Sequence, residues 1–180
     1  MSTCAPTTVP QLIVRRLRTS ASKGVIQCGN LSVPCSLGRS GTSVRKHEGD
    51  GATPWGRFAL CQVLYNPGAE RRPKTRLALR AISRSDGWCD APQDRNYNRL
   101  VRLPYTASAE RLWREDGLYD LVVVLDYNIR PRVRRNGSAI FMHIARPEFL
   151  PTEGCIALRR SDLLYLLARL RPGSKVVTTT

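Results

Sequence analysis

Hydrophobic residues lie in short runs, separated by turn-forming segments, along most of the chain. Several runs are rich in β-branched and aromatic residues and are bounded by Gly, Pro, Asn or Asp, which is typical of strands. The runs are QLIVRRL (11–17), GVIQCGNLSVPCSLG (24–38), GRFALCQVLY (56–65), RLALRAIS (76–83), YDLVVVLDYN (119–128) and AIFMHIA (139–145). Within the second run, the Gly29-Asn30 pair predicts a hairpin turn. The pattern predicts a mostly-β domain of two packed sheets, a β-sandwich.

The spacing of hydrophobic residues becomes helical only near the end of the chain, in SDLLYLLARLRPG (161–173). We expect Ser161 to cap the helix and Asp162 to favour its positive N-terminus. A proline and a glycine at 172–173 predict its end. The apolar positions would form one stripe that packs on the sheets: Leu163, Leu166, Leu167 and Leu170.

Two segments read as loops from their composition. Residues 38–56 hold five glycines and one proline, so they are expected to run over the surface, beside the turn that contains Cys155. Residues 83–104 are long, aromatic and polar, and loops of that length are usually functional or disordered. Trp88 and Tyr97 within this segment argue that it is ordered.

The 180 residues suffice for one domain with a sizeable core, and the 42% hydrophobic and 24% charged content is that of a globular protein. The net charge of +15 comes almost wholly from arginine, with 25 arginines and four lysines. Arginine suits carboxylates and phosphates, so anionic polymers are candidate partners. The arginines are scattered, however, which also fits a solvated surface, and no basic recognition helix predicts nucleic-acid binding.

The six cysteines are too few for a disulfide scaffold, and no C-x-x-C pair is present. With two histidines, the sequence predicts neither a metal site nor a cofactor. We see no segment of about 20 apolar residues that could span a membrane. The first 21 residues show no export signal, because their longest apolar run is LIV.

His143 and Cys155, twelve residues apart, are the candidate catalytic pair. In a strand over 139–145, His143 shares a face with Phe141 and Ala145. Cys155 follows Gly154, and a glycine allows a sharp turn that brings an N–H near a reacting carbonyl. A catalytic thiol needs a neighbour that lowers its pKa, such as an imidazolium. The alternative is a core histidine and an inert buried thiol.

The chain resembles the L,D-transpeptidase (YkuD-type) catalytic domain over residues 21–180, with residues 1–20 as an N-terminal extension or first strand. That family carries a histidine followed by a Ser/Thr-His-Gly-Cys turn, and a TPxGxF segment. The matching residues are His143, Thr152, Gly154 and Cys155 for the turn, and Thr53, Pro54, Gly56 and Phe58 for the segment. The chain departs from the family pattern in Glu153, which replaces a histidine, in Ala157, which replaces arginine or asparagine, and in the short interval from His143 to Cys155.

The resemblance implies a cysteine acyltransferase that acts on peptidoglycan stem peptides. Cys155 would attack the carbonyl of the third stem residue, the terminal D-residue would leave, and an amine would resolve the thioester. His143 would be the base, oriented by a backbone carbonyl, and the N–H groups of Gly154 and Cys155 would hold the oxyanion. The implied substrate-binding residues are Thr152, Glu153, Thr53 and Pro54, with Arg159 or Arg146 in place of the missing cation.

Two other functions stay open on the sequence. A peptidoglycan carboxypeptidase or endopeptidase would use the same Cys155 and His143 with water as acceptor. A non-catalytic, arginine-rich module for anionic polymers would need neither residue. The resemblance implies a periplasmic or cell-envelope location, whereas the lack of a visible signal leaves the cytoplasm as the alternative.

Overall fold

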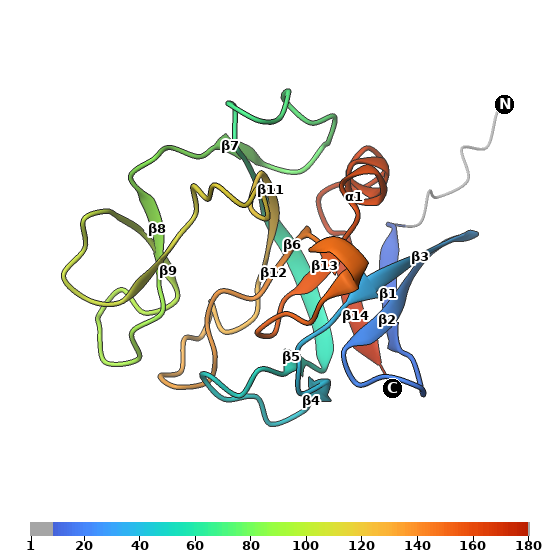
Figure 1. Cartoon of the computed structure of the whole chain (residues 1–180), viewed down its shortest axis with the longest axis horizontal. Coiled ribbons are helices and arrows are strands. Elements are labelled where there is room, and N and C mark those ends of the chain that lie inside the picture. Colours follow the sequence, from blue (N-terminus) through green and yellow to red (C-terminus); the bar gives the residue numbers. More distant parts are fainter. Residues whose placement is uncertain (1–8, 180) are drawn as a thin grey trace, which may run out of the picture.

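The computed structural model describes residues 9–179, which contain fourteen strands, one α-helix and one short 3-10 helix, η1 (Pro147–Phe149). Nine strands form the principal sheet (Figure 1). Their spatial order is β11 (Leu121–Leu125), β12 (Phe141–Ile144), β13 (Ile156–Leu158), β3 (Leu31–Ser36), β2 (Lys23–Cys28), β1 (Gln11–Arg16), β14 (Lys175–Thr179), β6 (Gly56–Tyr65) and β7 (Leu79–Ala81). The mostly-β prediction is confirmed, as is the turn at 29–30, which joins β2 to β3.

The principal sheet closes on itself, because β6, which lies beside β14 near one end of the order, also pairs with β11 at the other end. Residues near the start of β6 pair with β14, and residues from Leu60 to Tyr65 pair with β11. A register shift between Val124 and Leu125 accompanies the second pairing. Ten residues make β6 about 33 Å long, enough to serve both neighbours. The predicted two-sheet sandwich is therefore not confirmed, since one barrel-like sheet holds most of the strands.

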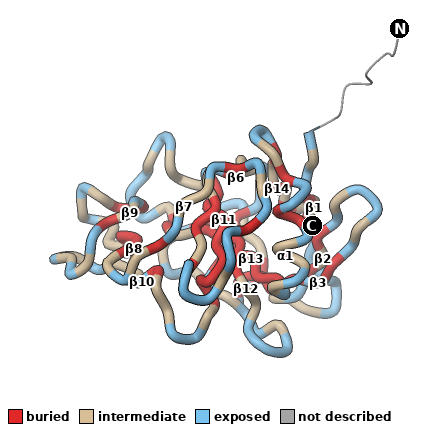
Figure 2. Tube along the Cα trace, turned by 90° about the horizontal axis from the view of Figure 1, so that it is seen from above, coloured by how far each residue is buried: buried red, intermediate tan, exposed pale blue. Residues whose placement is uncertain are grey.

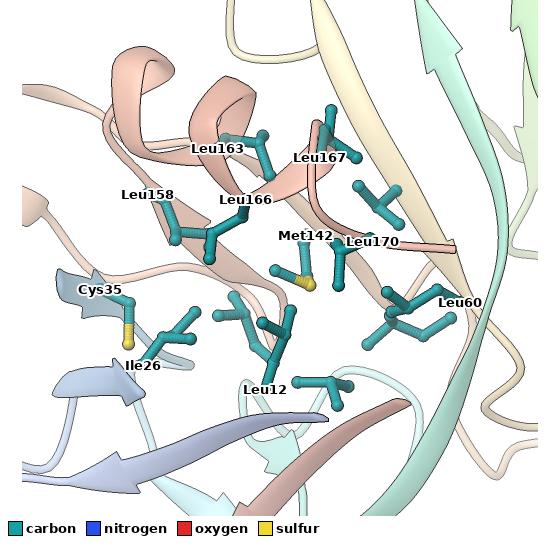
Figure 3. Packing of buried hydrophobic residues seen from close by; sticks show 14 of the residues in the cluster. Leu12, Ile26, Cys35, Leu60, Met142, Leu158, Leu163, Leu166, Leu167 and Leu170 are labelled. Carbon is teal, nitrogen blue, oxygen red and sulfur yellow. The ribbon is translucent and has the colours of Figure 1, made fainter. Parts of the chain in front are cut away.

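The main core fills the interior of this sheet and is covered by α1 (Arg160–Leu167). Figure 3 shows the α1 leucines turned toward side chains of the surrounding strands, including Met142 and Leu158. The predicted stripe is confirmed, because all four leucines are fully buried. The predicted cap is wrong: α1 begins one residue before Ser161, and Arg159 occupies the N-cap without a side-chain hydrogen bond.

A second, three-stranded sheet lies away from β1, β2 and β3 and has the order β10 (Ala109–Arg111), β8 (Asp86–Cys89), β9 (Arg99–Arg102) (Figures 1 and 2). The strands β8 and β9 form a hairpin, so the prediction of a loop throughout 83–104 is wrong. Trp88 in β8 packs edge-on against Phe141 of β12, with ring centroids 5.1 Å apart. A second buried cluster thus covers the outer face of β11 and β12.

The glycine-rich segment 38–56 lies beside the turn before β13, as predicted. The N–H of Arg39 donates to the Thr152 carbonyl at 2.8 Å, and the N–H of Thr152 donates to the Leu37 carbonyl at 3.0 Å. Two short strands inside the segment pair in parallel, β4 (Thr42–Ser43) and β5 (Thr53–Pro54). Contrary to a wholly exposed loop, residues 51–54 are buried, because the segment packs under the turn. None of the helices in residues 9–179 is long and apolar enough to cross a membrane.

Candidate active site

The structure brings Cys155 and His143 to the same face of two adjacent strands. In β12 and β13, which are parallel, Met142 pairs with Ile156 and His143 pairs with Ala157. Cys155 immediately precedes β13, so the register places it beside Phe141, whose side chain shares a face with His143. Both residues line one cavity of about 520 Å³. The sequence prediction that His143 shares a face with Phe141 is confirmed, since the Tyr119 ring packs edge-on against both.

The Cys155 thiol is held by backbone groups of the segment before β12. Its Sγ donates to the Ala139 carbonyl at 3.1 Å and accepts from the Phe141 N–H at 3.4 Å. Burial raises the pKa of the thiol to about 12, and the negative charge of Glu110 adds to that effect. The Phe141 N–H and the positive charge of Lys46 act in the opposite direction. The thiol is therefore protonated at neutral pH in this state.

The His143 imidazole is oriented by a backbone carbonyl. Its Nδ1 lies 2.8 Å from the Ile144 oxygen. A carbonyl oxygen only accepts hydrogen bonds, so Nδ1 carries the proton and Nε2 of the neutral ring keeps a lone pair. Burial lowers the pKa of His143 to about 4, and Arg114 and Arg146 lower it further, against the hydrogen bond to Ile144. His143 is thus a neutral base at pH 7.

The resting pair differs from the expectation that an imidazolium lowers the pKa of the thiol. Both groups are neutral, because desolvation penalises the charged form of each. Within the described residues, the thiol proton points to Ala139 rather than to His143. A transfer of the thiol proton to Nε2 would therefore require the Cys155 side chain to leave the Ala139 carbonyl.

The sequence profile of the YkuD family, the L,D-transpeptidase catalytic domain, matches residues 23–178.

The chain belongs to the L,D-transpeptidase family.

Among solved structures, it is similar to L,D-transpeptidase 1 of Mycobacterium tuberculosis, with 12% identity and a TM-score of 0.42. The alignment covers 94% of this chain and 59% of that one, so this chain spans about three-fifths of the length of that structure. No curated protein sequence matches the chain.

The Thr152 hydroxyl links the two ends of the turn at 152–155 by hydrogen bonds. This hydroxyl donates to the Cys155 carbonyl at 2.7 Å and accepts from the Gly154 N–H at 3.2 Å. Gly154 has a φ of +133°, and a Cβ there would lie 2.8 Å from the Ala52 carbonyl oxygen and 3.3 Å from Lys46 Nζ. Only glycine permits this approach. In this state the Gly154 N–H is engaged by Thr152, so it would hold an oxyanion only after leaving that partner.

Other residues predicted for the site divide into two groups. Arg146, Thr152 and Glu153 line the cavity, and Glu153 pairs with Arg39 at 2.9 Å on the exposed rim. Thr53, Pro54, Gly154 and Arg159 lie outside its lining.

Thr53 and Pro54 lie outside the lining of the cavity, and Thr53 contacts the backbone of the turn at 152–155. The Thr53 hydroxyl accepts from the Gly38 N–H at 2.8 Å and lies 3.4 Å from the Cys155 carbonyl oxygen. The Pro54 carbonyl accepts from the Thr178 hydroxyl at 2.7 Å. Because neither residue lines the cavity, their contact with substrate stays a prediction.

Arg159 was expected beside Ala157 by strand alternation. However, β13 ends at Leu158, and Arg159 is the N-cap of α1. Its guanidinium lies 5.3 Å from the centre of the Phe149 ring, away from the cavity. Arg146 does line the cavity, so of the two candidate cations only Arg146 has the predicted position.

Sequence reasoning missed several residues around the thiol. Lys46 is buried and donates to Asp50 at 2.7 Å, with its ammonium close to Gly154. Glu110 accepts from the Tyr119 hydroxyl at 2.7 Å within the cavity. These residues come from separate segments, so no local spacing predicts their meeting. Lys46 and Asp50 are the first and last residues of KHEGD (46–50), but no local spacing links them to Glu110 or Cys155.

Proposed function

We propose that the protein is a cysteine acyltransferase that acts on peptidoglycan stem peptides, an L,D-transpeptidase in activity as well as in family. The observation that carries the proposal is the position of Cys155 and His143. They lie on one face of adjacent strands, in one cavity, with the imidazole oriented by the Ile144 carbonyl so that Nε2 can accept a proton. A buried structural thiol would require neither the cavity nor an oriented base.

In the proposed first half-reaction, the sulfur of Cys155 forms a bond to the carbonyl carbon of the third stem residue. The thiol proton moves to His143 Nε2 and then to the leaving amino group, so that the amide C–N bond breaks and the terminal D-residue departs. The backbone N–H groups of Cys155 and Gly154 are the proposed donors to the oxyanion, the latter once released by Thr152.

In the second half-reaction, an amine of another stem attacks the thioester carbonyl. His143 Nε2 takes the proton of the attacking amine and returns it to the departing sulfur, which restores the neutral thiol. Water in place of the amine would make the same residues a hydrolase. Because peptidoglycan lies outside the cytoplasmic membrane, we propose the cell envelope as the site of action.

Product analysis tests this function. Purified protein is incubated with a synthetic stem tetrapeptide, with and without a D-amino acid as amine acceptor, and the products are separated by mass. The proposal predicts that the terminal D-residue is exchanged for the added amine and that Cys155→Ser abolishes the exchange. A trimmed tripeptide as the sole product would establish the hydrolase instead, and unchanged peptide with folded wild-type protein would contradict both.

A further inference from the structure

Four arginines lie on one surface of the protein, outside the lining of the cavity that contains Cys155. They come from two segments, 93–99 and 128–134, the first ending at the start of β9 and the second lying between β11 and β12. Three of the four are exposed, and the third in sequence is half-buried. We call these residues the arginine patch: Arg99, Arg130, Arg132 and Arg134.

Hydrogen bonds through two asparagines hold the two segments together. The Asn98 amide nitrogen donates to the Asn128 carbonyl at 2.8 Å, and Arg99 directly follows Asn98. The Asn128 side chain in turn accepts from the Val133 N–H at 2.7 Å and donates to the Val133 carbonyl at 2.9 Å. The arginines on either side of Val133 are therefore fixed near Arg99 by hydrogen bonds that do not involve the guanidinium groups.

Within residues 9–179, no carboxylate forms an ion pair with the arginine patch. Arg134 donates to the uncharged Gln93 side chain at 3.3 Å, and the other three arginines form no side-chain hydrogen bond to any described residue. The one acidic residue of segment 126–137 is Asp126, and its Oδ1 accepts from the Ala59 N–H at 2.8 Å instead. The Nε of Arg132 is buried without a partner in the described chain. Because buried donors are nearly always satisfied in native proteins, we expect an acceptor from outside these residues at this atom.

The fold holds these positive charges together against their mutual repulsion. Burial lowers the pKa of Arg132, and the positive charges of Arg99 and Arg130 lower it further. Neighbouring like charges destabilise each other when no counter-charge lies between them. A bound anion would remove this cost and supply the missing acceptor, and the guanidinium fork matches the oxygens of a phosphate group well.

We propose that the arginine patch binds an anionic polymer of the cell wall, a chain of phosphodiester-linked polyol units without bases. Several guanidiniums on one surface suit a ligand that carries several charges rather than a single small anion. In the described residues, the exposed aromatic side chains are Trp55 and Tyr165, and neither belongs to the two segments of the patch. Single-stranded nucleic acids are usually bound by stacking of bases on aromatic side chains, so a polymer without bases fits this surface better.

A lipid surface fits the patch less well than a polymer. A segment that lies in a membrane interface presents several apolar side chains, whereas Val133 is the only exposed large hydrophobic residue in 93–99 and 128–134. The proposal rests on the proposed function only in placing the protein in the cell envelope, where a wall polymer is available. Bound to such a polymer, the protein would stay close to the stem peptides on which Cys155 is proposed to act.

Fluorescence anisotropy with full-length protein and a labelled glycerol phosphate oligomer tests the patch without any acyl transfer. The proposal predicts that Arg130→Gln/Arg132→Gln weakens binding about tenfold or more at physiological salt. The slope of log affinity against log salt concentration should also become shallower by about 1.4, for two lost phosphate contacts. Arg99→Gln, at an exposed position, should weaken binding several-fold and keeps the test decisive if the double variant does not fold.

Arg15→Gln/Arg18→Gln is the matched control, because it removes the same charge from exposed arginines in and just after β1, which lies away from β9 (Figures 1 and 2). Distant exposed charges are screened by salt, so the control should change the affinity by less than about twofold. The proposal would be overturned by no binding of the oligomer to wild-type protein, by undiminished binding in the patch variants, or by an equal loss in the control. Tighter binding of an oligothymidylate or of anionic phospholipid vesicles at equal phosphate concentration would also overturn it. Failure of the acyltransferase proposal looks different: wild-type protein would bind the oligomer and leave every stem peptide intact.

Discussion

At the residue scale, the central pair combines a buried neutral thiol with a buried neutral imidazole. The thiol has a raised pKa and the imidazole a lowered one, both mainly through burial. Because the thiolate rather than the thiol is the nucleophile, we expect Cys155 to react slowly with alkylating agents at neutral pH in this state. Reactivity then depends on groups that favour the thiolate during attack.

The lowered pKa of His143 predicts a specific pH dependence of stability. The unfolded chain binds a proton near pH 6.5, whereas the folded protein resists protonation until about pH 4. The unfolded state therefore gains protons first as the pH falls, and the free energy of unfolding should drop by about 3 kcal/mol between pH 7 and pH 4. Denaturant titrations of wild type and His143→Gln should differ by roughly this amount in their pH dependence. If the free energy of unfolding had the same pH dependence in both proteins, the pKa of His143 would not be lowered by folding.

Lys46 is buried, with its Nζ close to Gly154 and paired with Asp50. Its positive charge lowers the pKa of Cys155. We expect Lys46→Met to shift the pH profile of Cys155 alkylation to higher pH, by about one unit for a lost charge of this kind. Lys46→Arg retains the charge and should restore part of the profile. Identical profiles for all three proteins would show that Lys46 has only a structural role.

Sequence patterns at this scale predict Cys155 and His143 but not their surroundings. The two residues occur in a short, recognisable turn and an adjacent strand, so local order reveals them. Lys46 and Glu110 come from different segments, and both act electrostatically on Cys155 only because the fold brings them near it. For the same reason, the sequence could not show that Arg159 belongs to the helix cap while Arg146 reaches the cavity.

At the element scale, the β8–β9 hairpin positions the backbone that holds the thiol. Asn98 is buried and follows Tyr97 at the end of the connection. Its Oδ1 accepts from Trp88 Nε1 at 2.8 Å and from the Ala139 N–H at 3.1 Å. Its amide nitrogen donates to the carbonyls of Tyr127 and Asn128. One side chain thus ties the hairpin to the residue whose carbonyl binds Cys155.

Removing Asn98 should disturb stability and the thiol together. In Asn98→Ala, several buried partners lose a hydrogen bond, and we expect the free energy of unfolding to fall by about 2–4 kcal/mol. Alkylation of Cys155 in the folded variant should also change in rate, because Ala139 is no longer fixed. Asn96→Ala, which loses a hydrogen bond to Tyr105 away from the cavity, should cost about 1 kcal/mol and leave the alkylation rate unaltered. Equal effects of the two substitutions would refute this role of Asn98.

The hairpin was beyond sequence prediction for a physical reason. β8 is four residues long, and all four are buried, so no alternation of polar and apolar positions marks it. Its sequence DGWC also contains residues that are uncommon in strands. By contrast, β11 and the β2–β3 hairpin were predictable, because a continuous run of valines and a Gly-Asn turn carry their own local signals.

At the scale of the whole molecule, two cores lie on opposite faces of β11 and β12. The α1 leucines and Met142 belong to the interior core, whereas Phe141 and Cys155 belong to the outer one. The mostly-β class of the fold could be predicted from the hydrophobic runs in the sequence. Closure of the sheet could not, because it depends on β6 pairing with β14 and β11 through different halves of one strand.

Because the two cores are separate, we predict that substitutions in the interior core lower the free energy of unfolding without changing the reaction rate. Leu166 is fully buried, so Leu166→Ala should lower the free energy of unfolding by about 2–5 kcal/mol. The reaction rate per folded molecule should stay near that of wild type at a temperature where the variant is folded. Tyr165→Ala, at a half-exposed position of the same helix, should cost less than about 1 kcal/mol. A lowered rate in fully folded Leu166→Ala would show that the two cores are coupled.

The most direct test of the account is the intact mass of the protein after reaction with a stem tetrapeptide and rapid acid quenching. A wild-type species heavier by the tripeptide acyl group, with the added mass on a fragment that contains Cys155, is the predicted result. His143→Ala should accumulate this species about 10²–10⁴ times more slowly, and Cys155→Ala should never form it. An adduct on Cys155→Ala, or a wild-type protein that converts peptide without any covalent intermediate, would contradict the assignment of Cys155 as the nucleophile.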